Sequence, residues 1–288
     1  MILMEIKTMI KLITDSGSDI SEKEANEFGI IMVPIEVHFG DEQYLDGVDL
    51  LPAEFYDKLV ASKELPHTSL INEFRWHEAF EKATKNGDEV VVIVLSSQLS
   101  GTFKCACDAA KDFAGKVYVV DGLSATLGQR LLCQYAMRLI SEGKKASKIA
   151  ELLEEKKQKL HIYAMIDTLK YLKKGGRISA TTAFFGEMLG IKPIVSVIDG
   201  KVEVIGKEKG HKKANQKLIN LVQKTGIDFS MPYGVLWTGN DTSLRDNFIE
   251  TAKDLWSEDS DNIQTHMMGS TIGTHIGPGA FGIVYFEK

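Results

Sequence analysis

Hydroxyl side chains gather in three short segments of the sequence, each placed between an apolar run and a predicted helix. The segments are "TDSGSD" at 14–19, "HTSLIN" at 67–72 and "SSQLSGT" at 96–102. In the last of them Ser96 and Ser97 end the apolar run, and Gly101 and Thr102 lie where a helix begins at about Ser100. Hydroxyls and backbone N–H groups that converge at a helix start can hold a carboxylate or a phosphate.

The second segment supplies two more hydroxyls, those of Thr68 and Ser69. In open α/β sheets the loops at the carboxyl ends of the strands form the ligand site, so we expect the three segments to meet there. The alternative for each segment is a plain helix N-cap, for which serine, threonine and aspartate are the preferred residues. Three such segments in one chain favour an anion site.

A lone histidine near the end of the chain lies among five glycines and one proline, in "GSTIGTHIGPGAFG" at 269–282. Gly273, Gly277 and Gly279 permit backbone angles that other residues resist, and Pro278 fixes its own. The pattern predicts a closely determined loop that holds the titratable side chain of His275. The alternative is a loop that only turns the chain before its last strand.

Arg177 follows a helical turn and two glycines in "LKYLKKGGRIS", residues 169–179. In a functional role, Arg177 is an anion partner or a residue of the domain interface. The alternative is that it belongs to a helix C-cap whose basic residues complement the helix dipole. A nucleotide site is weakly supported, because neither G-x-G-x-x-G after the first strand nor a phosphate loop is present. A serine hydrolase or acyl transferase that uses Ser97 with His275 stays open, although the sequence has no G-x-S-x-G elbow. The seven histidines and three cysteines show no metal-binding spacing.

The elements that must position these residues suggest two α/β domains, 1–160 and 161–288. In the first, β-branched runs alternate with helical patterns, which predicts a doubly wound parallel sheet. One predicted strand of this domain is "IIMVPIEVHF", with Pro34 as an edge or bulge signal. The second domain is predicted as mixed α/β, with a hairpin that turns at Asp199-Gly200 and a final strand pair, "NIQTHMMG" and "FGIVYFEK".

Bulk composition excludes several classes of protein. The 288 residues carry a net charge of −6, so a nucleic-acid partner is not expected. No apolar run approaches the roughly 20 residues that cross a bilayer, and the first residues do not resemble a secretory signal. We therefore expect a cytoplasmic protein without stable membrane insertion.

Five motifs occur in a specific order and spacing: "TDSGSD", "TSLIN", "SSQLSGT", "LKYLKKGGRIS" and "THIGPGAFG". In these motifs the chain resembles the DegV family of bacterial fatty-acid-binding proteins, from about Ile10 to the end. The resemblance implies that one long-chain fatty acid is buried between the two domains. It also implies that Thr68 or Ser69 and Ser96 or Ser97 hold the carboxylate, with His275 close by.

The resemblance further implies a carrier subunit without catalytic activity or cofactor of its own. A separate ATP-binding fatty acid kinase would phosphorylate the bound carboxylate to an acyl phosphate for phospholipid synthesis. A lipid-sensing regulatory protein is a further alternative. The family usually has arginines where this chain has Gly210 and His211, which leaves the docking of a partner kinase open. It commonly has "TSQPS" where this chain has "TSLIN", which leaves the shape of the pocket mouth around Leu70 and Ile71 open.

Overall fold

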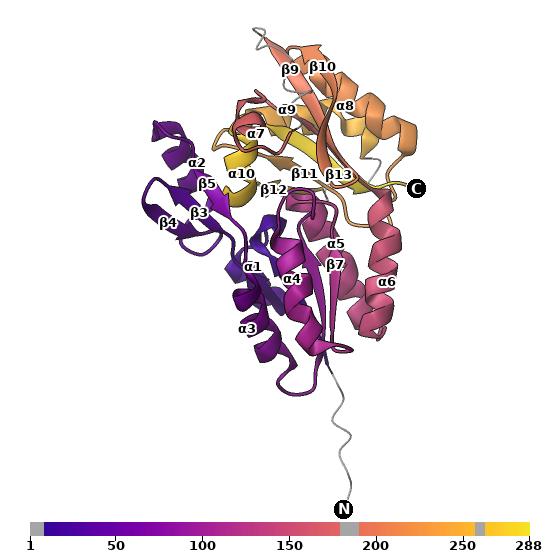
Figure 1. Ribbon diagram of the computed structural model, residues 1–288. Helices are drawn as coiled ribbons and strands as arrows, with labels where there is room; N and C mark the ends of the chain where they lie inside the picture. The colour runs from indigo at the N-terminus through magenta and orange to yellow at the C-terminus, as the bar shows by residue number, and fades with distance from the viewer. Residues whose placement is uncertain (1–8, 179–189, 257–262) are drawn as a thin grey trace, which may run out of the picture.

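The computed structural model describes residues 9–178, 190–256 and 263–288. Figure 1 shows two stacked lobes, the lower one formed by the first half of the chain and the upper one by the second. Ser179, at the end of the basic segment, and Asn262, at the start of a predicted strand, lie outside the described residues. Within the described ranges, no helix combines the length and apolar character that a membrane span requires.

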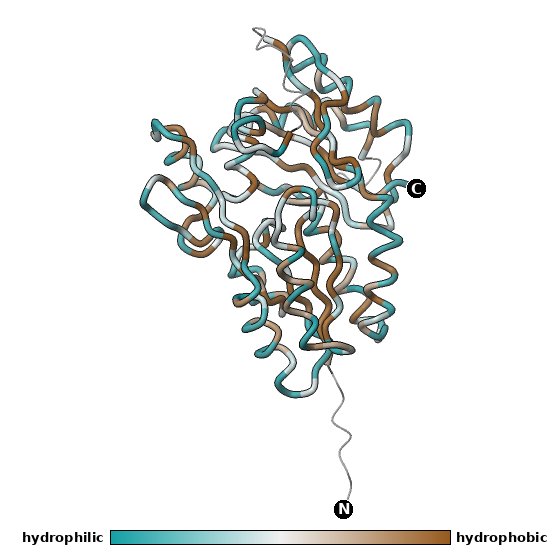
Figure 2. Tube along the Cα trace, in the orientation of Figure 1, coloured by the Kyte–Doolittle hydropathy of each residue, from teal (hydrophilic) through white to brown (hydrophobic). Residues whose placement is uncertain are grey.

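A four-stranded parallel sheet forms the centre of the first domain. Its strands are β1 (Ile10–Asp15), β2 (Ile30–Val33), β6 (Glu89–Val94) and β7 (Val117–Asp121), in the order β2-β1-β6-β7. The helices around it are α1 (Glu22–Phe28), α3 (Glu73–Thr84), α4 (Thr102–Ala110), α5 (Thr126–Ser141) and α6 (Ala146–Lys156). α3 and α4 pack on one face, whereas α1, α5 and α6 pack on the other. The predicted doubly wound domain is confirmed, and its central strands are the most apolar part of the trace (Figure 2).

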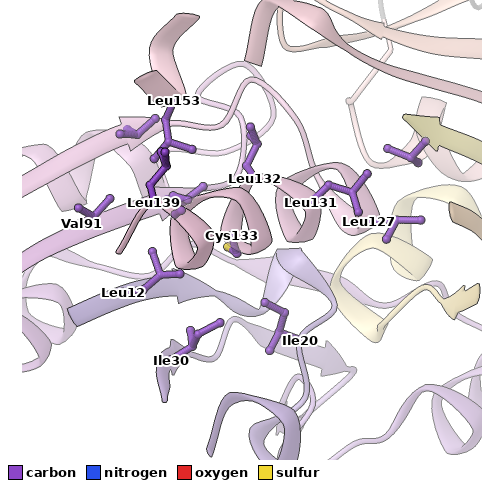
Figure 3. Close-up of a cluster of buried hydrophobic side chains, with 14 of the residues drawn as sticks. Leu12, Ile20, Ile30, Val91, Leu127, Leu131, Leu132, Cys133, Leu139 and Leu153 are labelled. Atoms are coloured by element: carbon purple, nitrogen blue, oxygen red, sulfur yellow. The ribbon is translucent and has the colours of Figure 1, made fainter. Parts of the chain in front are cut away.

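The helix α5 joins this domain to the second one. Figure 3 shows its side chains Leu127, Leu131 and Leu132 in one buried cluster with Leu12 of β1. The same cluster includes Phe286 from the second domain. The two domains therefore share apolar packing along α5, which limits how they can move relative to each other.

A six-stranded mixed sheet forms the second domain. Its strands are β8 (Leu160–Met165), β9 (Ile191–Ile198), β10 (Lys201–Lys209), β11 (Gly234–Trp237), β12 (Gln264–Met267) and β13 (Phe281–Phe286), in the order β10-β9-β8-β13-β11-β12. α8 (His211–Thr225) and α9 (Ser243–Thr251) pack on one face of this sheet. The mixed α/β class is confirmed, but the final strand pair is wrong. β11 lies between β12 and β13 and pairs with both of them.

A small antiparallel sheet, which the sequence did not suggest, lies beside the parallel one. It consists of β3 (Glu36–Phe39), β4 (Glu42–Leu45) and β5 (His67–Ser69), and α2 (Pro52–Ala61) packs on it. The predicted single strand "IIMVPIEVHF" is therefore two strands in different sheets, β2 and β3. Pro34 lies between them, where it can donate no backbone hydrogen bond to either ladder. Thr68 and Ser69 thus belong to the small sheet and do not follow a parallel strand.

His275 lies on a short helix, α10 (Ser270–Ile276), and not on the loop that its glycine neighbours predict. Gly277 ends this helix at φ +75°, as the glycine pattern suggests. Gly273 has a different role, because a Cβ atom there would lie 2.6 Å from Phe55 Cε1 and 2.7 Å from the Tyr56 hydroxyl oxygen on α2. Small size at position 273 allows the two helices to approach closely.

The predicted hairpin at Asp199-Gly200 is confirmed. Both residues have positive φ, +48° and +78°, as a two-residue turn with the twist of the flanking strands requires. The tip of the hairpin contacts the first domain, since Ser96 Oγ donates a hydrogen bond of 2.7 Å to the Gly200 carbonyl oxygen.

One pair of substitutions on α3 tests the packing of the parallel sheet. Trp76 is fully buried against Phe80, whereas Phe74 on the same helix is 70% exposed. We expect Trp76→Ala to lower the free energy of unfolding by about 3–5 kcal/mol, because it leaves a cavity. Phe74→Ala should change it by less than about 0.5 kcal/mol. Urea unfolding followed by circular dichroism measures both, and equal losses would contradict this packing.

Candidate functional site

A cavity of about 240 Å³ lies between the two domains. The parallel-sheet domain contributes Leu95 and Leu99 to its wall, and the mixed-sheet domain contributes Ile162, Val195 and Ile276. Most of the surrounding side chains are aliphatic, so the interior of the cavity is suited to an apolar chain.

Besides Thr126, Ser196 and Thr271, five lining residues on neighbouring elements have polar side chains, and we call these five the polar cluster. They are Thr68, Ser69, Ser100, Arg177 and His275. β5 carries the first two, and α10, which carries the histidine, lies beside both β5 and α7 (Lys170–Lys174), as Figure 1 shows. No carboxylate is found among the described lining residues, and Arg177 supplies the permanent positive charge.

Thr68 and His275 form the central contact of the polar cluster. Thr68 Oγ1 lies 3.1 Å from His275 Nε2. Burial and the nearby Arg177 charge lower the pKa of His275 to about 4, so its imidazole is neutral near pH 7. With the imidazole proton on Nε2, His275 donates to Thr68, and the Thr68 hydroxyl is left to donate into the cavity.

Close packing fixes the position of the His275 ring. A methyl group on Gly175, just after α7, would lie 2.3 Å from His275 Nδ1. A Cβ atom on Gly277 would meet the Tyr171 ring at 2.2 Å. The described part of the chain offers His275 Nδ1 no hydrogen-bond partner, so the ring is held by shape on that side.

Ser100 is a site residue that sequence reasoning missed, because it was interpreted only as the opening of a helix. Its hydroxyl oxygen lies 2.9 Å from Thr102 Oγ1 and accepts the Thr102 backbone N–H at 3.2 Å. Thr102 Oγ1 in turn accepts the backbone N–H of Ile71 at 3.2 Å. When Thr102 donates to Ser100, the proton of the Ser100 hydroxyl is free to point into the cavity.

Arg177 is anchored by its surroundings. Its Nε donates to the Leu99 carbonyl oxygen at 3.1 Å, and its Nη1 donates to the Gly175 carbonyl oxygen at 2.5 Å. These bonds use two of the five N–H donors of the guanidinium. Burial lowers the pKa of Arg177, but the group stays charged near pH 7. The site therefore contains one fixed cation beside neutral donors.

Ser69 has a histidine partner of its own on the neighbouring strand. Its Oγ lies 3.0 Å from His38 Nε2, and the His38 ring stacks on that of His67 at 4.8 Å. The adjacent hydroxyls Thr68 and Ser69 are thus each paired with a different imidazole.

Four residues that the sequence suggested as ligand contacts do not line the cavity. Ser96 is fully buried and bonds to the hairpin tip, because its side chain points toward the second domain and not toward the cavity. Ser97 accepts a hydrogen bond from the Gln98 side-chain amide, and its backbone N–H donates to Asp121. Thr102 lies behind Ser100, and Gly277 ends α10. The other predicted contacts do line the cavity, and they are Thr68, Ser69, Gly101, Arg177 and His275. Of the two residues expected at the pocket mouth, Leu70 lines the cavity and Ile71 is buried in the core.

The segment "TDSGSD" does not line the cavity, and its last residue, Asp19, instead forms a hydrogen bond to backbone of the second domain. Asp19 accepts the backbone N–H of Gly269 at 2.9 Å and also bonds to Thr126. Asp46 accepts both the backbone N–H and the hydroxyl of Ser270, at 3.0 and 2.6 Å. Burial raises the pKa of both carboxyls, to about 7 for Asp19. Two side chains of the first domain thereby fix the start of α10.

Comparison with known proteins relates this chain to one protein family. The family model described as DegV, a family of uncharacterised proteins, matches residues 9–288. A DegV domain-containing protein of Caldanaerobacter subterraneus is 36% identical, over 97% of this chain and 99% of its own length.

Solved structures agree with this match. One is described as a fatty-acid-binding DegV family protein from Thermus thermophilus. It is 28% identical with a TM-score of 0.87 and covers 98% of this chain and 100% of its own. The DegV fatty-acid-binding protein of Bacillus subtilis is also 28% identical, with a TM-score of 0.83 and the same coverage. From the shared length, motifs and fold, this chain belongs to the DegV family.

Proposed function

We propose that this protein binds one long-chain fatty acid in the cavity between its domains and presents the carboxylate to a partner. The observation that carries the proposal is the combination of an aliphatic cavity with the polar cluster on its wall. Support comes from relatives of the same fold. One of them, a DegV family protein from Eubacterium eligens, was solved loaded with heptadecanoic acid. It is 25% identical, has a TM-score of 0.83 and covers 97% of this chain and 100% of its own.

The acyl chain supplies the affinity in this proposal. Burying roughly 14 methylenes at about 0.8 kcal/mol each contributes on the order of 11 kcal/mol before the costs of association. A carboxylate loses its hydration when it is buried, so it needs donors in return. Thr68, Ser69 and Ser100 provide hydroxyl donors, and Arg177 provides the opposite charge.

These donors leave the carboxylate able to react. Neutral hydroxyls orient it without the tight bidentate hold of an arginine fork, and two of the Arg177 donors are already committed to carbonyl oxygens. We propose that a separate ATP-dependent kinase phosphorylates the carboxylate, and that His275 supports the forming acyl phosphate through its hydrogen bond to Thr68, whose hydroxyl donates to the carboxylate. This chain would be a carrier in the cytoplasm, built from domains 1–160 and 161–288, without catalysis of its own.

A hydrolase that uses Ser97 finds less support. His275 Nε2 is paired with Thr68, and Ser97 does not line the cavity. Partner docking retains a basic surface despite the missing arginines, because Lys212 and Lys213 are exposed in the first turn of α8, after Gly210 and His211. We propose this turn as the kinase contact.

Native mass spectrometry of the protein purified from bacteria tests the proposal first. We expect one stoichiometric fatty acid, which solvent extraction would identify. A protein that is empty and also fails to take up added fatty acid would overturn the proposed function.

Removing one hydroxyl tests the polar cluster. Thr68→Val keeps the shape of the side chain and should weaken hexadecanoate binding by roughly tenfold to a hundredfold, the range for a hydrogen bond to a charged group. Thr265→Val on β12, where the side chain is exposed, is the matched control and should bind normally. Calorimetric titration measures both, and unchanged affinity in Thr68→Val would exclude the assigned donor.

The protonation of His275 gives a pH-dependent signature. Because its folded-state pKa is about 4, the unfolded chain binds the proton more readily between about pH 6.5 and 4, so this group lowers stability as the pH falls through that window. We expect the ¹⁵N spectrum of the imidazole to remain that of the neutral ring at about pH 5.5. Bound carboxylate should raise this pKa. An imidazole that titrates near pH 6.5 in the free protein would contradict the buried contact with Thr68.

A further inference from the structure

The sheet of the second domain splits at one end. β8 and β9 pair at three positions, of which Tyr163 opposite Ser196 is the last. Beyond that pair each strand continues with its other neighbour, β8 with β13 as far as Leu160 and β9 with β10 as far as Ile198. The two halves of the sheet therefore diverge between Leu160 and Ile198.

A second cavity, of about 380 Å³, lies at this split. Apolar side chains from both halves line it, among them Leu160, Ile205 and Leu221, and the polar residues Gln158, His161, Tyr163, Ser196 and Asp199 line the rest. Ile198 on its rim is 46% exposed, so the cavity reaches the protein surface. Lys157 lies beside it, but the ammonium is held by the Asp121 carbonyl oxygen at 2.8 Å and by Glu154 at 2.6 Å.

The two cavities share part of their walls. Ser196 and Val197 line both, while Ile162 on the opposite strand lines the first. Val197 is half-buried and lies just beyond the last pair of β8 and β9. Val197 thus lies in the wall that the main cavity shares with the split.

The strands β8 and β9 also give the main cavity a direction. The polar cluster lies near the Met165 end of β8, because Arg177 follows α7 and His275 precedes β13, whose Phe281 pairs with Met165. Ile162 and Val197 are three residues further along these strands, or about 10 Å at 3.3 Å per residue. A carboxylate bound at the polar cluster therefore directs the methyl end of its chain toward the split.

The hairpin tip cannot provide an alternative route. Ser96 bonds to the Gly200 carbonyl oxygen, and a Cβ atom at Gly200 would lie 2.4 Å from Ser96 Oγ and 3.0 Å from Leu123. Figure 1 shows the β9-β10 hairpin reaching toward the first domain. Because the tip is packed against Ser96 and Leu123, a long chain that reaches the second cavity passes between the strands beside Val197.

We infer that the split between β8 and β9 is a second opening of the acyl cavity, which takes the methyl end of fatty acids too long for the main cavity. This inference rests on the proposed function, since it assumes a fatty acid with its carboxylate at the polar cluster. The split can take a methyl end, because apolar side chains from both halves of the sheet line it and, among its described lining residues, the Lys157 ammonium is already paired. Val197 is accordingly a residue that determines chain-length preference.

A chain-length series tests this role. We expect wild-type protein to bind dodecanoate, hexadecanoate and eicosanoate, with no loss of affinity for the longest. Val197→Phe should weaken eicosanoate binding by about tenfold, the equivalent of roughly two methylenes left unburied, and should weaken dodecanoate binding less, because little of that shorter chain extends past Val197. Val204→Phe is the matched control, because Val204 is a half-buried residue of the same hairpin that lines neither cavity. It should leave the whole series unchanged.

The outcomes separate the inference from the function on which it rests. A wild-type protein that binds none of the three acids would overturn the proposed function. Suppose instead that wild-type protein binds all three acids. A Val197→Phe variant that loses affinity equally for all of them, or loses none, would then overturn only the second opening. A Val204→Phe variant with the same chain-length selectivity as Val197→Phe would do the same. Circular dichroism checks that each variant is folded.

A second measurement does not depend on the bulky variant. Wild-type protein loaded with eicosanoate that carries a diazirine at its methyl end should, on irradiation, be labelled at the split, on residues such as Leu160, Ile205 or Leu221. Labels confined to the main cavity, or labels at the polar cluster from a reversed chain, would overturn the inference. Val197→Ala should raise the fraction of label found at the split.

Discussion

The contact between two buried carboxylates and the start of α10 determines the geometry of the whole site. Asp19 and Asp46 come from the first domain, and they accept hydrogen bonds from Gly269 and Ser270 at the head of a helix in the second. Backbone N–H groups in a first turn have no partners within their own helix, so these carboxylates satisfy donors that would otherwise be orphaned. His275 follows on the same seven-residue helix, and its position on Thr68 depends on this junction.

Small residues form the complementary constraint at the other surfaces of α10. Gly273 allows α2 to approach, Gly175 leaves room for the imidazole, and Gly277 faces the Tyr171 ring. Because each of these residues lacks a side chain, a neighbouring element can come into contact with α10, the helix that carries His275. The glycines around His275 thus serve close packing at least as much as backbone freedom, which explains why they surround a helix and not a loop.

The sequence alone predicted the elements whose patterns are local. The alternation of apolar runs with helices in the first domain and the Asp199-Gly200 turn depend on neighbouring residues, and both were confirmed. The small sheet was missed because its strands have three or four residues, too few to show a periodicity.

The candidate site was predictable in its residue types more than in their directions. The hydroxyl-rich segments and His275 could be found, but no local pattern shows which way a side chain points at the end of a strand. Ser96 therefore seemed equivalent to Thr68, although it faces the hairpin, and Ser100 was taken for a helix start although it lines the cavity. These assignments depend on contacts between residues about a hundred positions apart, such as Ser96 with Gly200.

The junction at α10 also couples folding to proton binding. Burial raises the pKa of Asp15 and of Asp19 to about 7 and raises that of Asp46, while N–H and hydroxyl donors act in the opposite direction. An unfolded chain releases these protons near pH 4, so between about pH 4 and 7 the folded protein holds protons on Asp15 and Asp19 that the unfolded chain has lost. The protein takes up protons as it folds in that range, and these carboxyls favour the folded state less as the pH rises. Titration curves of the folded and the unfolded chain would show this uptake as their difference.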